Sequence, residues 1–188
     1  MINVIYELPF FKQPTKLAGK LLGQWQITAV TEFQTGVPIT VGAAQDYAGI
    51  GTSDTQLWQV NGDPNNALLS RADRRFSQGS GDNNFWFAVK NPDGSPIFTQ
   101  PVAGTFSNQT KNTLSMIGNP GFQSWNIALF KTFRITERQR VNLRAEAFNW
   151  LNHPNWGSAD TNPTSATFGK VTSKSGSRNI QLSLHYSF

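Results

Sequence analysis

The chain has 188 residues, a formal net charge of +5 and no cysteine. The absence of cysteine excludes disulfide bonds and thiolate metal sites, and no stretch approaches the roughly 18 apolar residues that a membrane helix needs. Hydrophobic residues make up only 38% of the chain, although it contains 14 Phe and 6 Trp. Many aromatic and few aliphatic residues are typical of a membrane barrel with a thin apolar band and aromatic rims, or of a sugar-binding β protein.

The positive charges are spread along the chain and cluster only at Arg74-Arg75 and between Arg134 and Arg140. This spread indicates a solvated surface and not a nucleic-acid face, so we expect no nucleic acid among the partners. The first residues lack the basic start of a signal peptide, and Glu7 and Pro9 interrupt their apolar run. For an outer-membrane protein, we therefore expect the export signal to be missing from this chain and to lie upstream.

Two strands are predicted at the start of the chain. In residues 3–10 apolar and polar side chains alternate, and Pro9 suits a strand end because it cannot donate to a ladder. Residues 11–19 predict a short polar turn. Residues 20–35 alternate with period two and lack helical spacing, which predicts one strand longer than is typical of soluble proteins.

Residues 36–121 have no regular period and are punctuated by Gly, Asn, Asp, Ser and Pro. An irregular segment of this length is uncommon in a compact soluble domain, whereas long extracellular loops are typical of large membrane barrels. Trp58 and Trp86 in this loop are candidate ligand contacts, because an exposed ring can stack on a sugar or a peptide. The alternative is that both rings anchor the loop by packing.

Two further strands, residues 123–133 and 139–150, are joined by a tight charged turn at residues 134–138. Their alternation places Arg144 and Glu146 on the polar side of the second of these strands. The interior of a membrane barrel is polar. We therefore expect these two residues to belong to a lumen-facing polar network.

The last strand, residues 177–188, has the cleanest alternation in the chain. Its apolar positions are Ile180, Leu182, Leu184, Tyr186 and Phe188, and every residue between them is polar. Strict alternation predicts a strand with one apolar and one polar face. An aromatic carboxyl terminus on such a strand is typical of a transmembrane barrel, whose last strand closes against its first.

The four connections between these strands alternate between short and long: 11–19, 36–121, 134–138 and 151–176. Because neighbouring strands are antiparallel, the short turns lie at one end of the sheet and the long loops at the other, as in outer-membrane barrels. The expected fold is all-β. It is an antiparallel meander of about five long strands, an incomplete part of a transmembrane β-barrel with one very long extracellular loop.

A recognisable pattern runs through residues 118–122, 126–138, 144–156 and 168–171 and through the terminal strand. Its most specific parts are Arg144-Ala145-Glu146-Ala147-Phe148-Asn149 and the aromatic terminus. With these residues the chain resembles the C-terminal end of TonB-dependent outer-membrane receptors. The most similar type is the Oar-like group, which has an N-terminal carboxypeptidase-regulatory-like domain.

The resemblance implies a barrel of roughly 22 strands that is filled by a plug domain and energised through TonB. This chain would hold about five of those strands, as a C-terminal fragment of a transporter for an unknown ligand. The implied partners are outer-membrane lipid, the remainder of the receptor with its plug and missing strands, and TonB through the missing N-terminal part. A further implied partner is the barrel-assembly machinery, which would recognise Tyr186 and Phe188 as a C-terminal signal.

A soluble β-sandwich that binds carbohydrate or acts as an adhesin is the alternative. It accounts for the aromatic residues and the loops, but not for the terminal Phe188 or the alternating loop lengths. We expect no cofactor, no metal site and no catalytic residues, and hence no enzyme. No nucleophile elbow is present, and His153 and His185 fall at opposite ends of the last two predicted strands, whereas a metal ion needs converging ligands.

Overall fold

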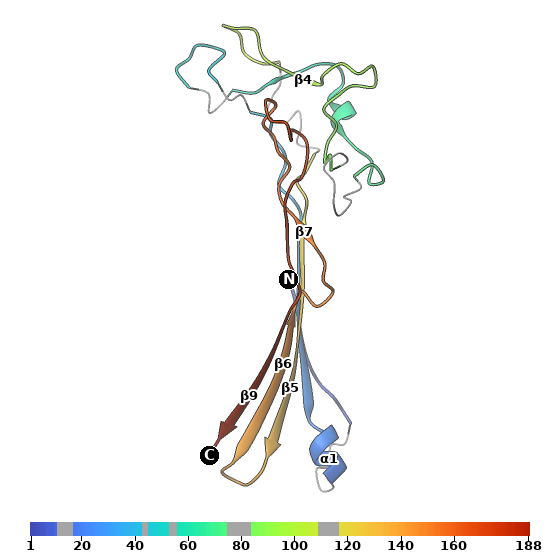
Figure 1. Ribbon diagram of the computed structural model, residues 1–188, viewed down its shortest axis with the longest axis vertical. Helices are drawn as coiled ribbons and strands as arrows, with labels where there is room; N and C mark the ends of the chain where they lie inside the picture. The colour runs from blue at the N-terminus through green and yellow to red at the C-terminus, as the bar shows by residue number, and fades with distance from the viewer. Residues whose placement is uncertain (11–16, 43–44, 53–55, 75–83, 109–116) are drawn as a thin grey trace. The chain divides into compact units, whose positions relative to one another are not determined.

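The computed structural model describes residues 1–10, 17–42, 45–52, 56–74, 84–108 and 117–188 (Figure 1). The chain divides into two compact units. The first, here called the sheet unit, comprises residues 1–34, 122–155 and 175–188. The second, here called the loop unit, comprises residues 35–121 and 156–174.

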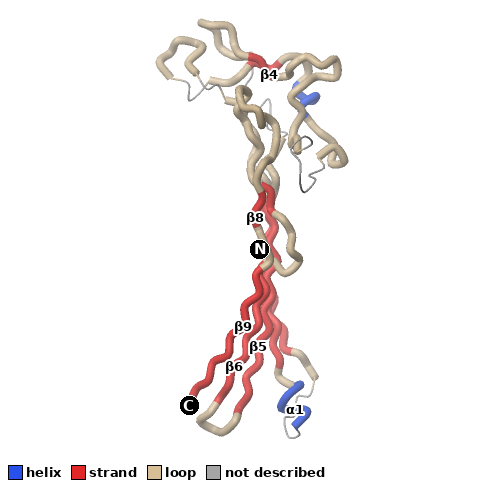
Figure 2. Tube along the Cα trace, viewed as in Figure 1, coloured by secondary structure: helices blue, strands red, loops and turns tan. Residues whose placement is uncertain are grey.

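The sheet unit contains one antiparallel sheet in which each long strand pairs with its neighbour in the chain (Figure 2). The order along the sheet is β1-β2-β5-β6-β9. This arrangement confirms the expected all-β antiparallel meander. The strands are β1 (Ile2–Glu7), β2 (Trp25–Gln34), β5 (Phe122–Arg134), β6 (Arg140–Phe148) and β9 (Asn179–Ser187).

The prediction of a strand over residues 20–35 is wrong at its start. A short helix, α1 (Leu17–Leu22), occupies this position, and β2 begins only at Trp25. Gln24 has a positive φ of 58°, so the chain turns sharply before it becomes extended. The indole Nε1 of Trp25 donates to the carbonyl of Leu21 at 3.2 Å, which connects the helix to the strand. Within the described residues, no helix has the length and apolarity to cross a membrane.

Strand β6 ends at Phe148, two residues earlier than expected, because Asn149 adopts a left-handed conformation with φ 47°. The Asn149 side chain stabilises the turn that follows. Its Oδ1 accepts from the backbone N–H of His153 at 3.0 Å, and its Nδ2 donates to the carbonyls of His153 and Gly176. Asparagine tolerates this conformation better than other residues with a Cβ.

The loop unit has little regular structure. Its elements are the strand pair β3 (Gln59–Val60) and β4 (Phe98–Thr99), and the 3-10 turn η1 (Pro64–Ala67). A second short pair, β7 (Asn155–Trp156) and β8 (Lys174–Ser175), has one residue of each strand in either unit. Residues 11–16 of the expected first turn, and 43–44, 53–55, 75–83 and 109–116 of the expected long loop, lie outside the described residues.

A hydrophobic core nevertheless organises the loop unit. Phe87, which is fully buried, stacks edge to face with Phe98 and Phe168 at centroid distances of 5.9 and 5.5 Å. Residues distant in the chain therefore hold together a segment that has no period of its own. The buried cluster consists of Ile39, Val41, Trp58, Val60, Ala67, Phe87, Ile97, Phe98, Ile117, Ala159 and Val171.

Candidate functional site: the two faces of the long sheet

The strand register places most apolar side chains of the long strands on one side, which we call the apolar face, whereas Ile5, Val30, Phe122, Ala128, Phe130 and Phe148 lie on the other. Paired residues share a face of a sheet, and successive residues alternate between faces. The polar exceptions on this face are Thr31, Gln123 and Lys131. Its apolar members are Ile2, Val4, Tyr6, Trp25, Ile27, Ala29, Phe33, Trp125, Ile127, Leu129, Phe133, Val141, Leu143, Ala145, Ala147, Ile180, Leu182, Leu184 and Tyr186.

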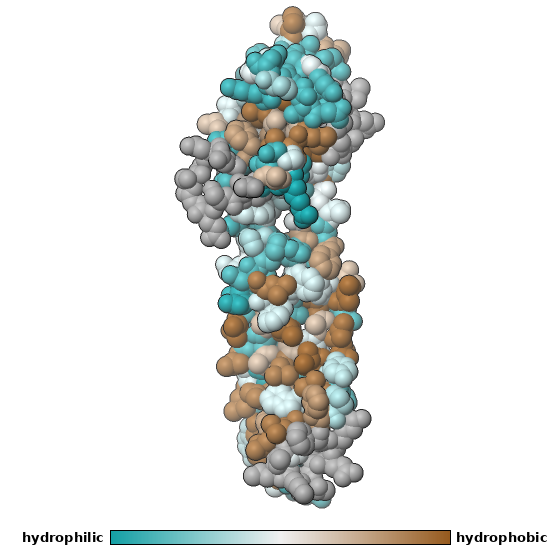
Figure 3. Space-filling view, turned by 90° about the vertical axis from the view of Figure 1, so that its right-hand side faces the viewer, coloured by the Kyte–Doolittle hydropathy of each residue, from teal (hydrophilic) through white to brown (hydrophobic). Residues whose placement is uncertain are grey.

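Much of the apolar face is exposed within the described chain. On β9, Ile180, Leu182 and Leu184 are 67%, 72% and 70% exposed. The space-filling view shows apolar residues gathered over the strands of the sheet (Figure 3). Soluble proteins rarely leave a contiguous apolar surface of this kind uncovered. The face is therefore suited to an apolar medium.

Aromatic rings lie at both ends of the apolar face. Near the β5–β6 hairpin, the ammonium of Lys131 lies 5.8 Å from the ring centroid of Trp25 and 5.3 Å from that of Phe133. Lys131 is buried, and its ammonium group also donates a hydrogen bond to the carbonyl of Gly23. Toward the opposite end, Trp125 packs edge to face against Phe33 at 5.3 Å. Aromatic rings at two levels are typical of side chains that lie at lipid–water interfaces.

Tyr186 and Phe188 lie at the end of the terminal strand. Tyr186 pairs with Val141 and is half exposed on the apolar face, while Phe188 is 94% exposed. Their ring centroids are 5.9 Å apart. The two rings therefore form a small aromatic surface, of which the Phe188 ring packs on little else in the described chain.

The opposite side of the sheet carries the polar residues and is here called the polar face. Arg144 and Glu146 lie on it and form the ion pair of the sheet, so the structure brings together the two residues predicted to share a network. The Arg144 guanidinium also lies 5.0 Å from the ring centroid of Phe130. The polar members are Asn3, Glu7, Gln26, Thr28, Glu32, Gln34, Ser124, Asn126, Thr132, Arg134, Arg140, Asn142, Arg144, Glu146, Asn179, Gln181, Ser183, His185 and Ser187.

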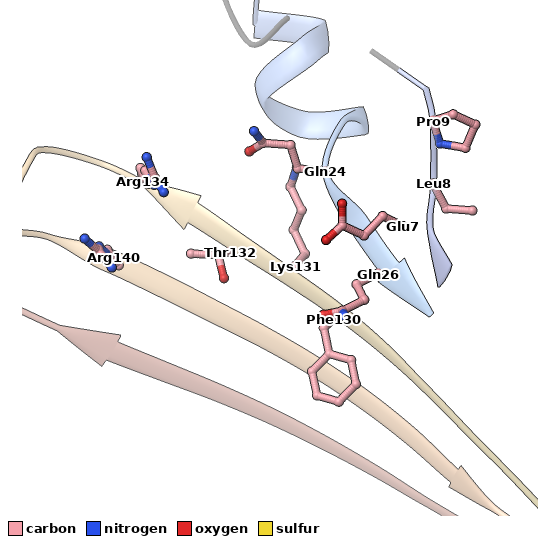
Figure 4. A pocket seen from close by; sticks show the side chains of 10 residues that line it. All are labelled: Glu7, Leu8, Pro9, Gln24, Gln26, Phe130, Lys131, Thr132, Arg134 and Arg140. Atoms are coloured by element: carbon pink, nitrogen blue, oxygen red, sulfur yellow. The ribbon is translucent and has the colours of Figure 1, made fainter. Parts of the chain in front are cut away.

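A hollow of about 690 Å³ lies along the polar face near the β5–β6 hairpin (Figure 4). Two arginines line it, Arg134 at the end of β5 and Arg140 at the start of β6. Arg134 is predicted from the sequence to lie in the charged turn, and Arg140 is not among the predicted site residues. Counting by twos from Arg144 would have placed Arg140 on the same face. The remaining lining residues are Glu7, Leu8, Pro9, Gln24, Gln26, Phe130, Lys131 and Thr132.

The two candidate ligand contacts, Trp58 and Trp86, lie in the loop unit. Trp58 is 8% exposed and belongs to the buried cluster. Trp86 packs against that cluster, donates its Nε1 to the carbonyl of Gly118 at 2.6 Å, and has the Arg74 guanidinium 4.6 Å from its ring centroid. This packing favours the anchoring alternative, and ligand contact by either ring remains a prediction.

A carboxylate organises one exposed turn of the loop unit. Asp46 accepts from the backbone N–H groups of Gly49, Ile50 and Gly51 at 2.9, 3.1 and 2.6 Å, and from the Gln56 side chain. The Gln56 hydrogen bond is the main reason that the pKa of Asp46 lies below its ordinary value; desolvation opposes this shift, and the backbone donors add to it. The donors already surround this carboxylate, so its role is structural.

The histidines do not converge. His185 lies on β9 opposite Asn142, whereas His153 follows the far end of β6. In the part of the chain that the structure describes, no group of three or more His, Asp or Glu side chains is arranged to hold a metal ion.

Comparison with known protein families gives one finding. The family model described as "Outer membrane beta barrel domain" matches residues 1–181. No curated protein and no solved structure matches the chain.

Proposed function

This chain belongs to the outer membrane β-barrel domain family and is located in the outer membrane, and we propose that it forms the C-terminal wall of a TonB-dependent receptor. The proposed receptor takes up a ligand whose identity is unknown, and it is of the Oar-like type that the sequence resembles. The proposed role is transport, without catalysis and without a cofactor.

The division of the sheet into an apolar and a polar face is the observation that carries this proposal. The apolar face fits lipid, and the polar face fits the interior of a large barrel. A small barrel could fill its interior with its own side chains, whereas a barrel of roughly 22 strands needs a plug. The charged pair Arg144 and Glu146 on the polar face suits contact with such a plug.

The order of the connections supports the same proposal. Residues 8–24 join β1 to β2, a longer connection than the predicted turn at 11–19 because it includes α1, and residues 135–139 join β5 to β6. Residues 35–121 join β2 to β5, and residues 149–178 join β6 to β9. In a meander of antiparallel strands, the two long connections leave from the same end of the sheet. We propose that this end is extracellular, because outer-membrane barrels have long outer loops and short periplasmic turns.

The proposal assigns partners to particular residues. Lipid contacts the apolar face, and the remaining strands of the barrel pair with the free edges of β1 and β9, since an open sheet edge is not stable in lipid. Tyr186 and Phe188 are the signal for the barrel-assembly machinery. Trp58 and Trp86 shape the outer loops, and TonB contacts a part of the receptor outside this chain.

Capture of TonB from intact cells tests the proposal. An epitope placed in the exposed turn at Asp93-Gly94 would allow the receptor to be isolated after formaldehyde treatment. A TonB-dependent receptor captures TonB, whereas a porin that carries the same epitope does not. Isolation of the intact tagged receptor without TonB, under conditions in which an authentic TonB-dependent receptor captures it, would contradict the proposed function.

A further inference from the structure

Two arginines lie opposite each other at the hairpin end of the polar face, and neither forms an ion pair with a described residue. Arg134 and Arg140 are directly paired in the β5–β6 register, and both line the hollow on the polar face. Figure 4 shows them on neighbouring strands. Like charges directly opposite each other destabilise a sheet. A sheet that keeps such a pair gains if an anion binds between the two side chains.

The ion pair on the polar face is that of Arg144 with Glu146, and neither Arg134 nor Arg140 forms one within the described residues. Glu137, in the turn between the two arginines, lines a hollow with them but forms no ion pair with either. Glu146 lies six residues beyond Arg140 along β6, about 20 Å away at ~3.4 Å per residue. That distance is more than twice the screening length of roughly 8 Å at physiological ionic strength.

Glu7 is also too distant to neutralise the pair. It pairs with Gln26, which in turn pairs with Phe130, so Glu7 lies two strands away from β5 and four residues short of Arg134. With strands ~4.8 Å apart and ~3.4 Å per residue, the two Cα atoms are about 17 Å apart. Glu7 therefore belongs to the opposite wall of the hollow.

The surroundings of the two arginines add positive charge. An adjoining hollow of about 490 Å³ is lined by Lys20, Arg134 and Arg140, with Glu137 as its single carboxylate. The guanidinium group is planar and binds a carboxylate through two parallel hydrogen bonds. Two such groups on adjacent strands form a fork that fits one carboxylate or two neighbouring ones.

We propose that Arg134 and Arg140, here called the arginine pair, bind a carboxylate of an acidic polypeptide segment that lies against the polar face. This inference rests on the proposed function, in which the polar face lines a barrel filled by protein. A lipid phosphate fits less well, because the register places the arginine pair on the face opposite to Phe133 and Tyr186. The apolar side chains of Leu8 and Phe130 beside the hollow also suit a polypeptide better than a free inorganic anion.

Photo-crosslinking from Thr132 tests the arginine pair in the intact receptor in cells. Thr132 is exposed and lies two residues from Arg134 on the same face. Benzoylphenylalanine at this position should crosslink to a peptide that contains Asp or Glu. The double variant R134E/R140E should lower the yield of this product roughly tenfold or more, because two charge-assisted contacts become repulsive. The variant R134K/R140K should retain much of the yield.

Two controls keep the result interpretable. The same probe at Ile180, on the apolar face, should give products that do not depend on the arginine pair. The amount and heat-modifiable mobility of each variant in the outer membrane report its folding, and the single variant R140Q replaces the double variant if the latter fails to fold. Changing the crosslinked Asp or Glu to Arg should restore the product in R134E/R140E.

Three outcomes would overturn the arginine pair as a peptide site: no crosslinked product at Thr132, a crosslink to lipid, or an equal yield of product in the parental chain and in R134E/R140E. These outcomes are separable from failure of the receptor assignment. If TonB is captured but the yield of the Thr132 product is unchanged in R134E/R140E, only the role proposed for the arginine pair is contradicted. If the product depends on charge but the acidic peptide belongs to a protein other than the receptor, the arginine pair is supported and the plug assignment fails.

Discussion

The two units of this chain place their apolar residues in opposite ways. In the loop unit, buried residues such as Phe87, Ile97 and Val171 form a protein core. In the sheet unit the corresponding side chains are partly buried on the inner strands and exposed on the outer ones, as at Ile180, Leu182 and Leu184. Among the described residues, the only buried apolar side chain of the sheet unit is Ala128. One unit is therefore stabilised in water, and the other requires an apolar surrounding.

The arrangement of the apolar side chains distinguishes the two units. The apolar side chains of the loop unit come from segments distant in the chain and meet in one cluster. Those of the sheet unit lie at alternate positions on adjacent strands, so they form a surface and not a core. Removal from water stabilises both arrangements, with protein as the apolar surrounding in one and lipid in the other.

The largest effect is expected in the core of the loop unit. Phe87→Ala should cost about 3–5 kcal/mol, because it removes a fully buried ring and leaves a cavity. We expect faster proteolysis of the loop unit on intact cells, without loss of the sheet unit from the membrane. Phe106→Ala is the matched control, since Phe106 belongs to the same unit and is 70% exposed. Equal protease resistance of the two variants would contradict the assigned core.

A charge on the apolar face should have the next largest effect. Leu182→Arg is expected to cost about 2–4 kcal/mol if Leu182 faces the bilayer midplane, as measured by denaturant unfolding in lipid vesicles. Gln181→Arg is the control, since this neighbouring residue lies on the polar face opposite Glu146. If the apolar face were in water, the exposed Leu182 would tolerate arginine, and the two variants would unfold alike.

A smaller effect on folded stability, but a clear one on assembly, is expected for Phe188→Ala. Phe188 is 94% exposed, so replacing it with alanine removes few contacts within the chain. We expect less receptor inserted in the outer membrane, with an unchanged unfolding midpoint for the fraction that is inserted. Phe188→Tyr should assemble normally. Normal insertion of Phe188→Ala would remove the assembly role and leave a ring at the membrane interface.

The smallest effect is expected at Asp46. Its pKa lies below the ordinary value of 3.8, mainly through the Gln56 hydrogen bond. Because the folded pKa is lowered, this stabilisation is present above pH 3.8 and is lost as the pH falls through the folded pKa. Asp46→Asn should therefore speed hydrogen exchange at the Gly49 and Gly51 amides at neutral pH, and the difference from the parental chain should vanish in acid. A difference that persists in acid would contradict the role of the charge.

The sequence predicted the parts of the fold that depend on local alternation. Period two along β5, β6 and β9 was sufficient to find these strands and their faces, and to place Arg144 and Glu146 together. The start of β2 was misplaced because Leu21 and Leu22 fit a strand as well as a short helix. Only the left-handed turn at Gln24 separates the two interpretations.

By itself, the sequence determined which side chains share a face, since alternation is a property of consecutive residues in an extended chain. The tertiary structure decided what alternation does not encode. It brought Phe87, Phe98 and Phe168 together in the loop unit, and it set Arg134 opposite Arg140 across a hairpin. Both depend on contacts between residues that are not neighbours in the chain. Such contacts follow from strand register and from packing, which a single sequence specifies only through the complete fold.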